Sequence, residues 1–514
     1  MKFFKKILAG FIGTAMLSNS GIFFNAIASA EQVLVGYYGD INMDNNIDLS
    51  DAASLQKYLM NPISFENSEM YRRADLNGDG KINISDLSLL KQAILGTYNW
   101  RGIYEEREVE PTFIDAPISS VSASMPSQGD ASLVIFYIDF PDCKYSNKLT
   151  TQQIEEMAFG QANENSEYYP FESMNGFFER SSKGNLNLSG NVFSYTAKNS
   201  ISSYNNDKAA LTKECFEAFK NIVDFSQYDK DKDGVIDATL LTVPETASDD
   251  YWWPCAGGFE DSKYKVDGVK VGHLITGNAA PSNYSNFNST YLHEMGHCMG
   301  LPDYYLYFSA DSEGMHGAGG IELMDMDAYS DFCSFSKLML GWYQENQVSV
   351  YDTSMGTQTY KLKNAQTKDG NCVIIPCGKL DDNYFSEYFI VEYATTDNNN
   401  SAVNKKIWWG STDSGIRIHH INAELYSDTW TYLKYQNGSE YTKNDDAGIR
   451  LIRLVNDGGS MFKTGSIINN STPGFKWYDS NEQESIAPNI SIEVGELQDG
   501  EYTITVSPSA LSTN

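Results

Sequence analysis

One short stretch of the chain combines two histidines and a glutamate at a spacing that suits a metal ion. His293 and His297 are four residues apart, so on a helix their imidazoles face the same side. Two imidazoles on one helix face can share a tetrahedral zinc ion, and a glutamate beside the first of them, Glu294, can reach a water molecule on that ion. The spacing therefore predicts a zinc site with His293 and His297 as ligands and Glu294 as general base.

A third zinc ligand is expected from the residues that follow. Gly300 suits a left-handed turn that ends the helix, and the turned chain can bring Asp303 back to the histidines. The fourth position would then remain for water. Glu313 and Glu322 are alternative carboxylate ligands, whereas Cys298 lies off the histidine face and is interpreted as a packed thiol.

An internal repeat predicts a second kind of metal site. The loop from Asp40 to Asp51 recurs from Asp75 to Asp86, and each copy runs into a helical pattern. Ca²⁺ takes six to eight oxygen ligands from such bent loops, with a backbone carbonyl at position 7. The predicted calcium-binding residues are Asp40, Asn42, Asp44, Asn46, Asp48 and Asp51 in the first loop and Asp75, Asn77, Asp79, Lys81, Asn83 and Asp86 in the second.

A further acidic cluster precedes the histidines. Asp229, Asp231, Asp233 and Asp237 alternate around a turn glycine, Gly234, as in a calcium loop, but the acidic twelfth position is not clear. The cluster is a candidate structural calcium site. The alternative is a solvated turn that leads into a strand at 238–243.

Charge and length narrow the classes of function. The chain has 514 residues, which predicts several domains, and a net charge of −31, which disfavours binding to nucleic acid or anionic membranes. Residues 1–30 have the basic start, apolar run and small-residue cleavage site of a signal peptide, so we expect secretion and no membrane insertion after its removal. Seven sparse cysteines do not indicate a disulfide framework.

The pattern of elements divides the rest of the chain into four regions. Residues 36–98 predict a small α-helical module of two calcium loop-helix repeats, and the proline-broken residues 99–130 predict a linker or short pro-segment. Residues 131–348 mix helices with buried strands, which predicts an α/β domain around the zinc helix. Short strands and turns from 349 to 514 predict a β-rich C-terminal region of sandwich type.

The repeat region resembles a type I dockerin over almost its whole length. The resemblance implies two bound calcium ions and a cohesin module of a scaffoldin as partner, as in a cellulosome. Loop positions 10 and 11 steer the choice of partner in that family, and here they are Leu49, Ser50, Ile84 and Ser85. Because the two pairs are similar but not identical, binding in two orientations stays open.

The region from 130 to 345 resembles the secreted metallopeptidases of the immune inhibitor A type. Three stretches carry the likeness besides the zinc helix, at 133–142, 177–186 and 320–342. The resemblance implies a metzincin-like α/β zinc endopeptidase, with Met324 in the turn beneath the metal and Met326 as the alternative. It further implies an oxyanion role for Tyr329, and His316 is a candidate for substrate contact.

The leading hypothesis is a secreted zinc endopeptidase that acts on proteins or peptides and is attached to a cohesin-bearing scaffold. One alternative is a catalytically inert, peptidase-like binding protein on the same scaffold. A weaker alternative is a glycoside hydrolase, prompted only by the dockerin-like module and by 8 Trp and 33 Tyr. Proteolysis that a chelator abolishes would separate the three.

Overall fold

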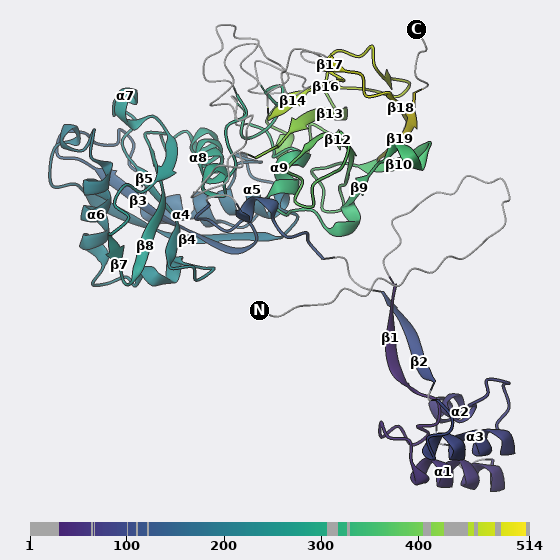
Figure 1. The fold of residues 1–514 in the computed structure, drawn as a ribbon. Coiled ribbons are helices and arrows are strands. Elements are labelled where there is room, and N and C mark those ends of the chain that lie inside the picture. The colour runs from purple at the N-terminus through teal and green to yellow at the C-terminus, as the bar shows by residue number, and fades with distance from the viewer. Residues whose placement is uncertain are drawn as a thin grey trace. The chain divides into compact units, whose positions relative to one another are not determined.

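The structure is a computed structural model whose chain forms two compact units, one at Asn25–Pro111 and a large one that contains Thr112–Asn514 (Figure 1). The predicted signal peptide lies almost entirely outside the described residues, as do Glu313, His316 and Met326. The described residues are 30–62, 65, 67–99, 101–108, 112–120, 123–305, 317–325, 329–403, 413–425, 451–456, 461–478 and 485–509.

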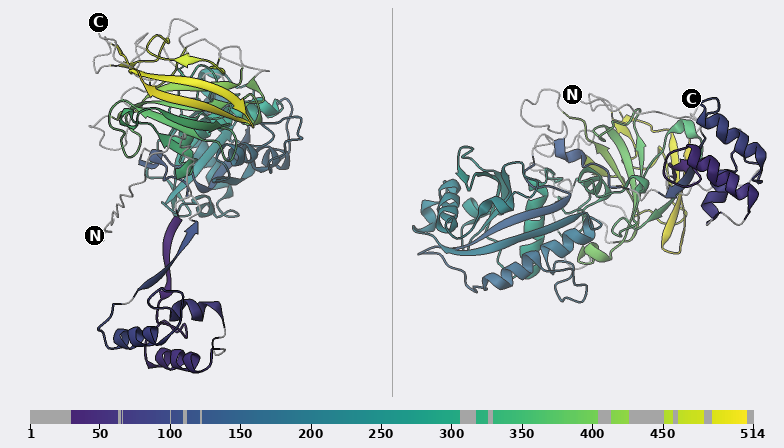
Figure 2. Two further views of the ribbon diagram at one scale, coloured as in Figure 1. Left: turned by 90° about the vertical axis from the view of Figure 1, so that its right-hand side faces the viewer. Right: turned by 90° about the horizontal axis from the view of Figure 1, so that it is seen from below.

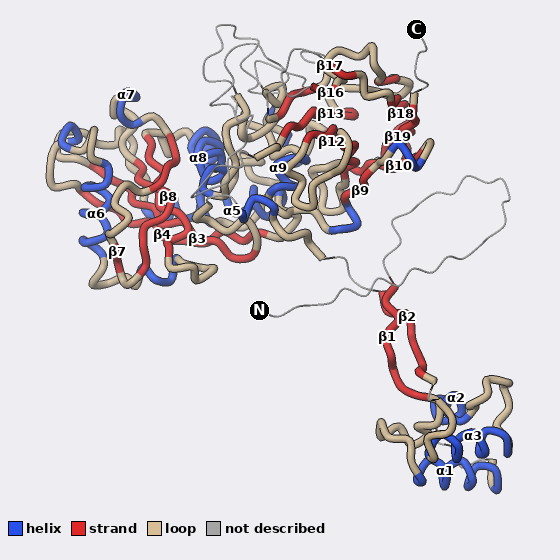
Figure 3. The backbone as a smooth tube through the Cα atoms, in the orientation of Figure 1, coloured by secondary structure: helices blue, strands red, loops and turns tan. Residues whose placement is uncertain are grey.

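The N-terminal unit consists of three short helices and a two-stranded ribbon. The elements are β1 (Ala30–Tyr37), α1 (Leu49–Met60), α2 (Ser68–Ala74), α3 (Ile84–Ile94) and β2 (Gly102–Glu108). Strands β1 and β2 pair antiparallel and form a two-stranded ribbon that extends away from the three helices (Figure 3). Helices α1 and α3 pack through a small core that includes the fully buried Leu55 and Leu90, as the repeat predicts.

The first part of the large unit contains a six-stranded sheet in the order β4-β3-β5-β8-β6, with β7 beside β8. Strands β4, β3, β5 and β8 are parallel, and the edge strand β6 pairs antiparallel with β8. The strands are β3 (Gly129–Asp139), β4 (Leu186–Thr196), β5 (Val235–Thr242), β6 (Cys255–Gly258), β7 (Lys265–Val266) and β8 (Val269–Gly277).

Helices cover both faces of this sheet. Leu133 and Ile135 of β3 join an apolar cluster with one set of helices, whereas Val134 and Phe136 join a second cluster on the opposite face, because side chains alternate along a strand. The first set is α4 (Thr151–Phe159), α5 (Met174–Ser181), α8 (Tyr284–Cys298) and α9 (Ser334–Met339); α6 (Lys208–Phe219) and the short α7 (Asp249–Trp252) contribute to the second.

The C-terminal part of the large unit contains two further sheets, which confirms the predicted β-rich region. Their orders are β14-β13-β12-β11-β9 and β10-β19-β18-β15, and they lie face to face around a shared apolar cluster (Figure 2). The strands are β9 (Val348–Val350), β10 (Gln358–Lys363), β11 (Cys372–Pro376), β12 (Glu387–Ala394), β13 (Gly415–Asn422), β14 (Ile452–Leu454), β15 (Ile467–Ile468), β18 (Ile490–Gln498) and β19 (Glu501–Pro508), besides a hairpin of β16 (Trp477–Tyr478) and β17 (Ser485–Ile486).

The outer face of the five-stranded sheet is also buried. Ile374, Ile390 and Ile421 belong to the same apolar cluster as Leu292 of α8. The β-rich part therefore shares one core with the α/β part and is not a separately packed module within the large unit.

The segment predicted as a linker, 99–130, is divided between the two units. Its first half forms β2, whereas Phe113 makes a β-bridge to Gln344 and the side chains of Ile118 and Met125 are 1% exposed in the core of the large unit. The prolines and serines of this stretch indicated a loose connector, but its few apolar residues are anchored by burial.

Candidate metal centre

Helix α8 positions the two predicted histidines. Its apolar residues from Phe287 onward, including Tyr291, are fully buried, so the helix runs through the core and its orientation is fixed by packing. His293 and His297 lie one turn apart with ring centroids separated by 4.9 Å and planes at 89°. Both rings are largely buried on the side of the helix that Asp303 faces.

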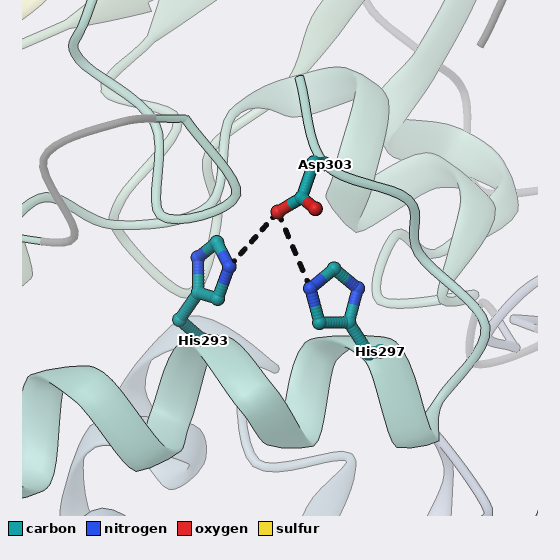
Figure 4. Close-up of side chains that lie close together, drawn as sticks. All are labelled: His293, His297 and Asp303. Atoms are coloured by element: carbon teal, nitrogen blue, oxygen red, sulfur yellow. Dashed lines mark hydrogen bonds and ion pairs between the residues drawn. The ribbon is translucent and has the colours of Figure 1, made fainter. Parts of the chain in front are cut away.

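The helix ends in a Schellman turn, as the sequence predicts for Gly300. The N–H of Leu301 donates to the Gly296 carbonyl over 3.0 Å, and the N–H of Gly300 donates to the His297 carbonyl over 2.9 Å. Gly300 has φ of +100°, a conformation that side chains with a Cβ rarely adopt. The turn sends the chain back over the helix and brings Asp303 above the two histidines (Figure 4).

Asp303 meets both histidines through one oxygen atom. Its Oδ1 lies 3.0 Å from Nε2 of His293 and 3.3 Å from Nε2 of His297. A ligand atom from each of the three residues falls within 4.8 Å of the others, so a single ion could be held by all of them. Two imidazoles and one carboxylate are a donor set that zinc takes in catalytic sites.

A hydrogen bond on the far side of each histidine ring orients Nε2 toward the position where a cation would bind. Nδ1 of His293 lies 2.7 Å from the Leu323 carbonyl, and Nδ1 of His297 lies 2.8 Å from the Leu301 carbonyl. A carbonyl only accepts, so each Nδ1 carries a proton, and a ring without a second proton would point the lone pair of Nε2 at the Asp303 carboxylate. Lone pairs that face one another repel, and a proton or a metal cation between them removes the repulsion.

The pKa values of the cluster agree with this reading. Burial by itself lowers the pKa of His297, but the hydrogen bond and charge of Asp303 outweigh it and raise that pKa to about 9. Burial works to raise the pKa of Asp303, yet the close contacts with both histidines hold it well below its usual range. Without a cation, a proton lies between His297 and Asp303, and a bound metal ion would replace it.

Glu294 lies next to this cluster and is 6% exposed. Burial raises the pKa of its carboxyl above the ordinary value, although the neighbouring histidines work in the opposite direction. The backbone of Ala256 in β6 lies close to the same carboxylate and has a smaller, lowering effect on its pKa. A desolvated carboxylate beside a metal-bound water is suited to take a proton and return it.

The structure places Met324 beneath the histidines. A β-carbon added to Gly296 would lie 2.3 Å from Sδ of Met324, so the thioether packs against α8 between His293 and His297. Glu322, the alternative ligand, is directed away from the cluster: it accepts hydrogen bonds from the Met324 N–H and from Oγ of Ser336 over 2.7 Å.

Two other predicted residues lie away from the cluster. The hydroxyl of Tyr329 donates to Oδ1 of Asn286 over 2.8 Å, about two turns before His293 on α8, so the structure does not bring it to the metal ligands. Cys298 is fully buried and burial raises the pKa of its thiol, in keeping with a packed side chain.

The acidic cluster before the histidines is only partly assembled. Asp229, Asp231 and Asp237 each bring a carboxylate oxygen within 4.8 Å of the others, whereas Asp233 is not part of that group. Asp237 is fully buried and accepts hydrogen bonds from the N–H and Oγ of Ser132. The structure therefore retains three of the four predicted residues as one group.

The twin loops of the N-terminal unit have the same local geometry. Asp48 and Asn83 cap α1 and α3, each in a capping box with the carboxylate three residues on, Asp51 or Asp86. Asp51 accepts from the N–H of Ile41, Asn42 and Asp48, and Asp86 from the N–H of Asn77 and Asn83, so each carboxylate closes its loop.

The sharp turn occurs in both loops. Asn45 has φ of +66° and Gly80 has φ of +76°, so asparagine adopts the same left-handed conformation as the glycine. The carboxylates of Asp40 and Asp75 accept backbone N–H groups of their own loops, from Asp44 and from Gly80 respectively. Asp40 also forms an ion pair of 2.6 Å with the buried Arg73, which the sequence did not indicate.

Comparison with known families settles the identity of this unit. Residues 38–95 match the family model described as dockerin type I domain. The N-terminal module is a type I dockerin. No curated protein matches the chain.

The dockerin implies attachment to a cohesin scaffold and calcium binding. Proteins that carry dockerins are typically extracellular components of cellulosomes. Its predicted contact residues Leu49 and Ile84 are the first residues of α1 and α3 and are 75% and 76% exposed, which is unusual for large apolar side chains. Within the described residues, no helix has the length and apolar content needed to cross a bilayer.

The groups that the sequence did not reveal are mostly backbone atoms. The carbonyls of Leu301 and Leu323 and the backbone of Ala256 lie close to the cluster, but backbone groups carry no residue signature. Tyr305 was also missed: its ring lies 6.4 Å from that of His293 at 21°, and it is hydrogen-bonded to Asp303. Its place two residues after Asp303 is the only signal that could have drawn attention to it.

Proposed function

We propose that the chain is a secreted zinc-dependent endopeptidase that its dockerin carries to a cohesin-bearing scaffold. The observation that supports the proposal best is the convergence of His293, His297 and Asp303 with the buried Glu294 beside them. The proposal also draws on the resemblance of 130–345 to peptidases of the immune inhibitor A type.

His293, His297 and Asp303 would hold the zinc ion, which when bound supplies a Lewis acid for the scissile carbonyl and lowers the pKa of a water molecule. The two backbone carbonyls behind the histidines hold a proton on Nδ1 of each ring, so Nε2 is the atom that each ring would offer to the ion. The thioether of Met324 supports the helix between the two ligands.

Glu294 is the general base of the proposed reaction. It takes a proton from the attacking water and passes that proton to the nitrogen of the leaving amine, so one carboxylate serves both halves of hydrolysis. Burial of this carboxyl raises its pKa above the ordinary value.

The edge strand β6 favours an extended peptide as substrate. It carries Ala256 next to Glu294, and among the described residues it pairs only with β8, so its other edge offers backbone hydrogen bonds. An extended chain can add to such an edge as a further strand. This feature supports a peptidase over a glycoside hydrolase, for which the site offers no comparable support.

Replacing the proposed base tests the assignment. Glu294→Ala removes the carboxylate but leaves all three ligands, so the variant should bind about one zinc ion per chain and cleave a labelled unstructured protein at least 100-fold more slowly than wild type. Cleavage by Glu294→Ala at the wild-type rate would show that Glu294 is not the base. Zinc binding by wild type without any cleavage would favour the inert binding protein.

A further inference from the structure

Segment 317–325 lies between the predicted metal ligands and the five-stranded C-terminal sheet. Hydrogen bonds within and around this segment orient one of its backbone carbonyls. That carbonyl belongs to Leu323 and lies 2.7 Å from Nδ1 of His293. Oδ2 of Asp325 accepts the N–H groups of Ala318 and Gly320, each over 2.9 Å, and so folds the segment on itself. The fold of this segment therefore determines the orientation of the Leu323 carbonyl toward His293.

The five-stranded C-terminal sheet holds the other side of the same segment. Nη1 of Arg417 in β13 donates to the Ile321 carbonyl over 2.9 Å. Nε2 of His419 lies 3.3 Å from the Ala318 carbonyl, and the N–H of Leu454 donates to the Gly317 carbonyl over 3.2 Å. Three contacts from β13 and β14 thus fall on Gly317, Ala318 and Ile321, shortly before the carbonyl that meets His293.

Arg417 is itself held firmly. Its side chain is 1% exposed, and Nε lies 2.5 Å from Oε1 of Glu392. The other oxygen of Glu392 accepts from the N–H of Ser334 over 2.9 Å. Apolar residues in place of a buried ion pair often leave stability unchanged or increase it, so stability alone does not account for this arrangement.

We propose that Arg417 is a positioning residue for the metal centre: it fixes the Ile321 carbonyl and, through segment 317–325, the Leu323 carbonyl that orients His293. The C-terminal sheet then has a role in the metal site although it supplies no ligand. The inference rests on the proposed function, because it takes His293 as a zinc ligand. Beyond the proposed activity, it assigns the β-rich region a role in orienting a zinc ligand.

The effect should appear in the metal affinity. Partners that orient a ligand imidazole typically change metal affinity 10- to 100-fold when they are replaced. Arg417→Lys keeps a positive charge beside Glu392, but one ammonium cannot reproduce the planar fork that reaches Glu392 and Ile321 together. We expect zinc affinity to fall about 10-fold, as measured on the full chain by competition with a chromophoric chelator.

A matched control is available in Arg180 of α5. It is also largely buried and paired with a carboxylate, Glu172, over 2.5 Å, and its other hydrogen bonds go to Pro170 and Asn399. Arg180→Lys should leave the zinc affinity within about twofold of wild type. Cobalt absorption adds a second readout: the ligand-field bands of the cobalt form should change in Arg417→Lys and stay unchanged in Arg180→Lys.

A measurement on wild-type protein keeps the inference testable if Arg417→Lys does not fold. Coupling between two sites is reciprocal, so zinc that needs β13 in place must also stabilise β13. Amide hydrogen exchange at Arg417 and its neighbours in β13 should slow when zinc is added. Exchange in β18 and β19, which belong to the other sheet, should not change.

The outcomes separate this inference from the proposed function. A full chain that takes up no zinc overturns both. A chain that binds zinc, but whose β13 exchanges at the same rate with and without the ion, overturns the positioning role of Arg417 alone. So does a folded Arg417→Lys variant with the zinc affinity and cobalt spectrum of wild type.

Discussion

Sδ of Met324 occupies the space that a β-carbon on Gly296 would need, since the two atoms would be 2.3 Å apart. Gly296 lies on α8 between His293 and His297, so the glycine is what lets the thioether approach the helix there. The contact ties the turn after Glu322 to the part of α8 that carries the predicted ligands.

This contact predicts a non-additive pair of substitutions. Alanine favours a helix over glycine by about 1 kcal/mol, but Gly296→Ala must also displace Met324 from a fully packed site. We expect Gly296→Ala to lower the free energy of unfolding in the wild-type chain and to raise it, or leave it unchanged, in a Met324→Ala background. Urea unfolding of the four proteins measures the difference; equal effects in both backgrounds would disprove the contact.

The third ligand can be tested against the carboxylate that the structure directs elsewhere. Asp303→Asn weakens the donor that faces both histidines, so the variant should lose zinc on dialysis, with an affinity at least 100-fold below wild type. Glu322→Gln leaves the three donors in place and should retain about one zinc ion per chain. Metal analysis after dialysis distinguishes them, and a reversed result would make Glu322 the ligand.

The parts of the site that the sequence predicts are those set by local geometry. His293, Glu294 and His297 follow from helix periodicity, and Gly300 with Asp303 follows from the rule for helix ends. The dockerin loops were recognisable for the same reason, because every ligand lies within one short segment that is repeated.

The remaining parts depend on contacts between distant segments. Arg417 meets Ile321 only because β13 packs behind segment 317–325, and the Leu323 carbonyl meets His293 through the same packing. Alternation of apolar residues predicted the strands of the C-terminal region but not which face of a sheet would cover the metal cluster. Similarly, the prolines of 99–130 predicted an exposed linker, although Ile118 in this segment is buried.

The buried His419 predicts a pH dependence of stability. Burial, with the charge of Arg417 beside it, lowers its pKa to about 4 from an ordinary value of 6.5. Between these values the unfolded chain binds a proton that the folded chain does not, so the free energy of unfolding falls as the pH drops. From pH 7 to 4.5 this one group should cost about 2–3 kcal/mol.

His419→Gln removes the titrating group but keeps a donor for the Ala318 carbonyl. Urea unfolding of the metal-free proteins at pH 7 and pH 4.5 should therefore show a smaller loss of stability in the variant. Identical losses in the two proteins would mean that His419 does not remain neutral in the folded state.

The dockerin loops predict separable calcium sites. Asp86 closes the second loop through the N–H groups of Asn77 and Asn83, so Asp86→Ala should bind one calcium ion fewer than the wild-type chain. Ser85→Ala changes the neighbouring residue without removing a ligand and should bind as many ions as wild type. Calorimetric titration with Ca²⁺ gives the numbers, and an unchanged number for Asp86→Ala would contradict the assignment of this loop.

The proposed zinc-dependent peptidase activity can be measured as cleavage of a labelled, unstructured protein by the chain without residues 1–30. Activity should disappear with phenanthroline, return when zinc is added, and accompany about one zinc ion per chain in the large unit. A chain that contains no zinc, or one whose cleavage of the protein is unaffected by the chelator, would show that the protein is not a zinc peptidase.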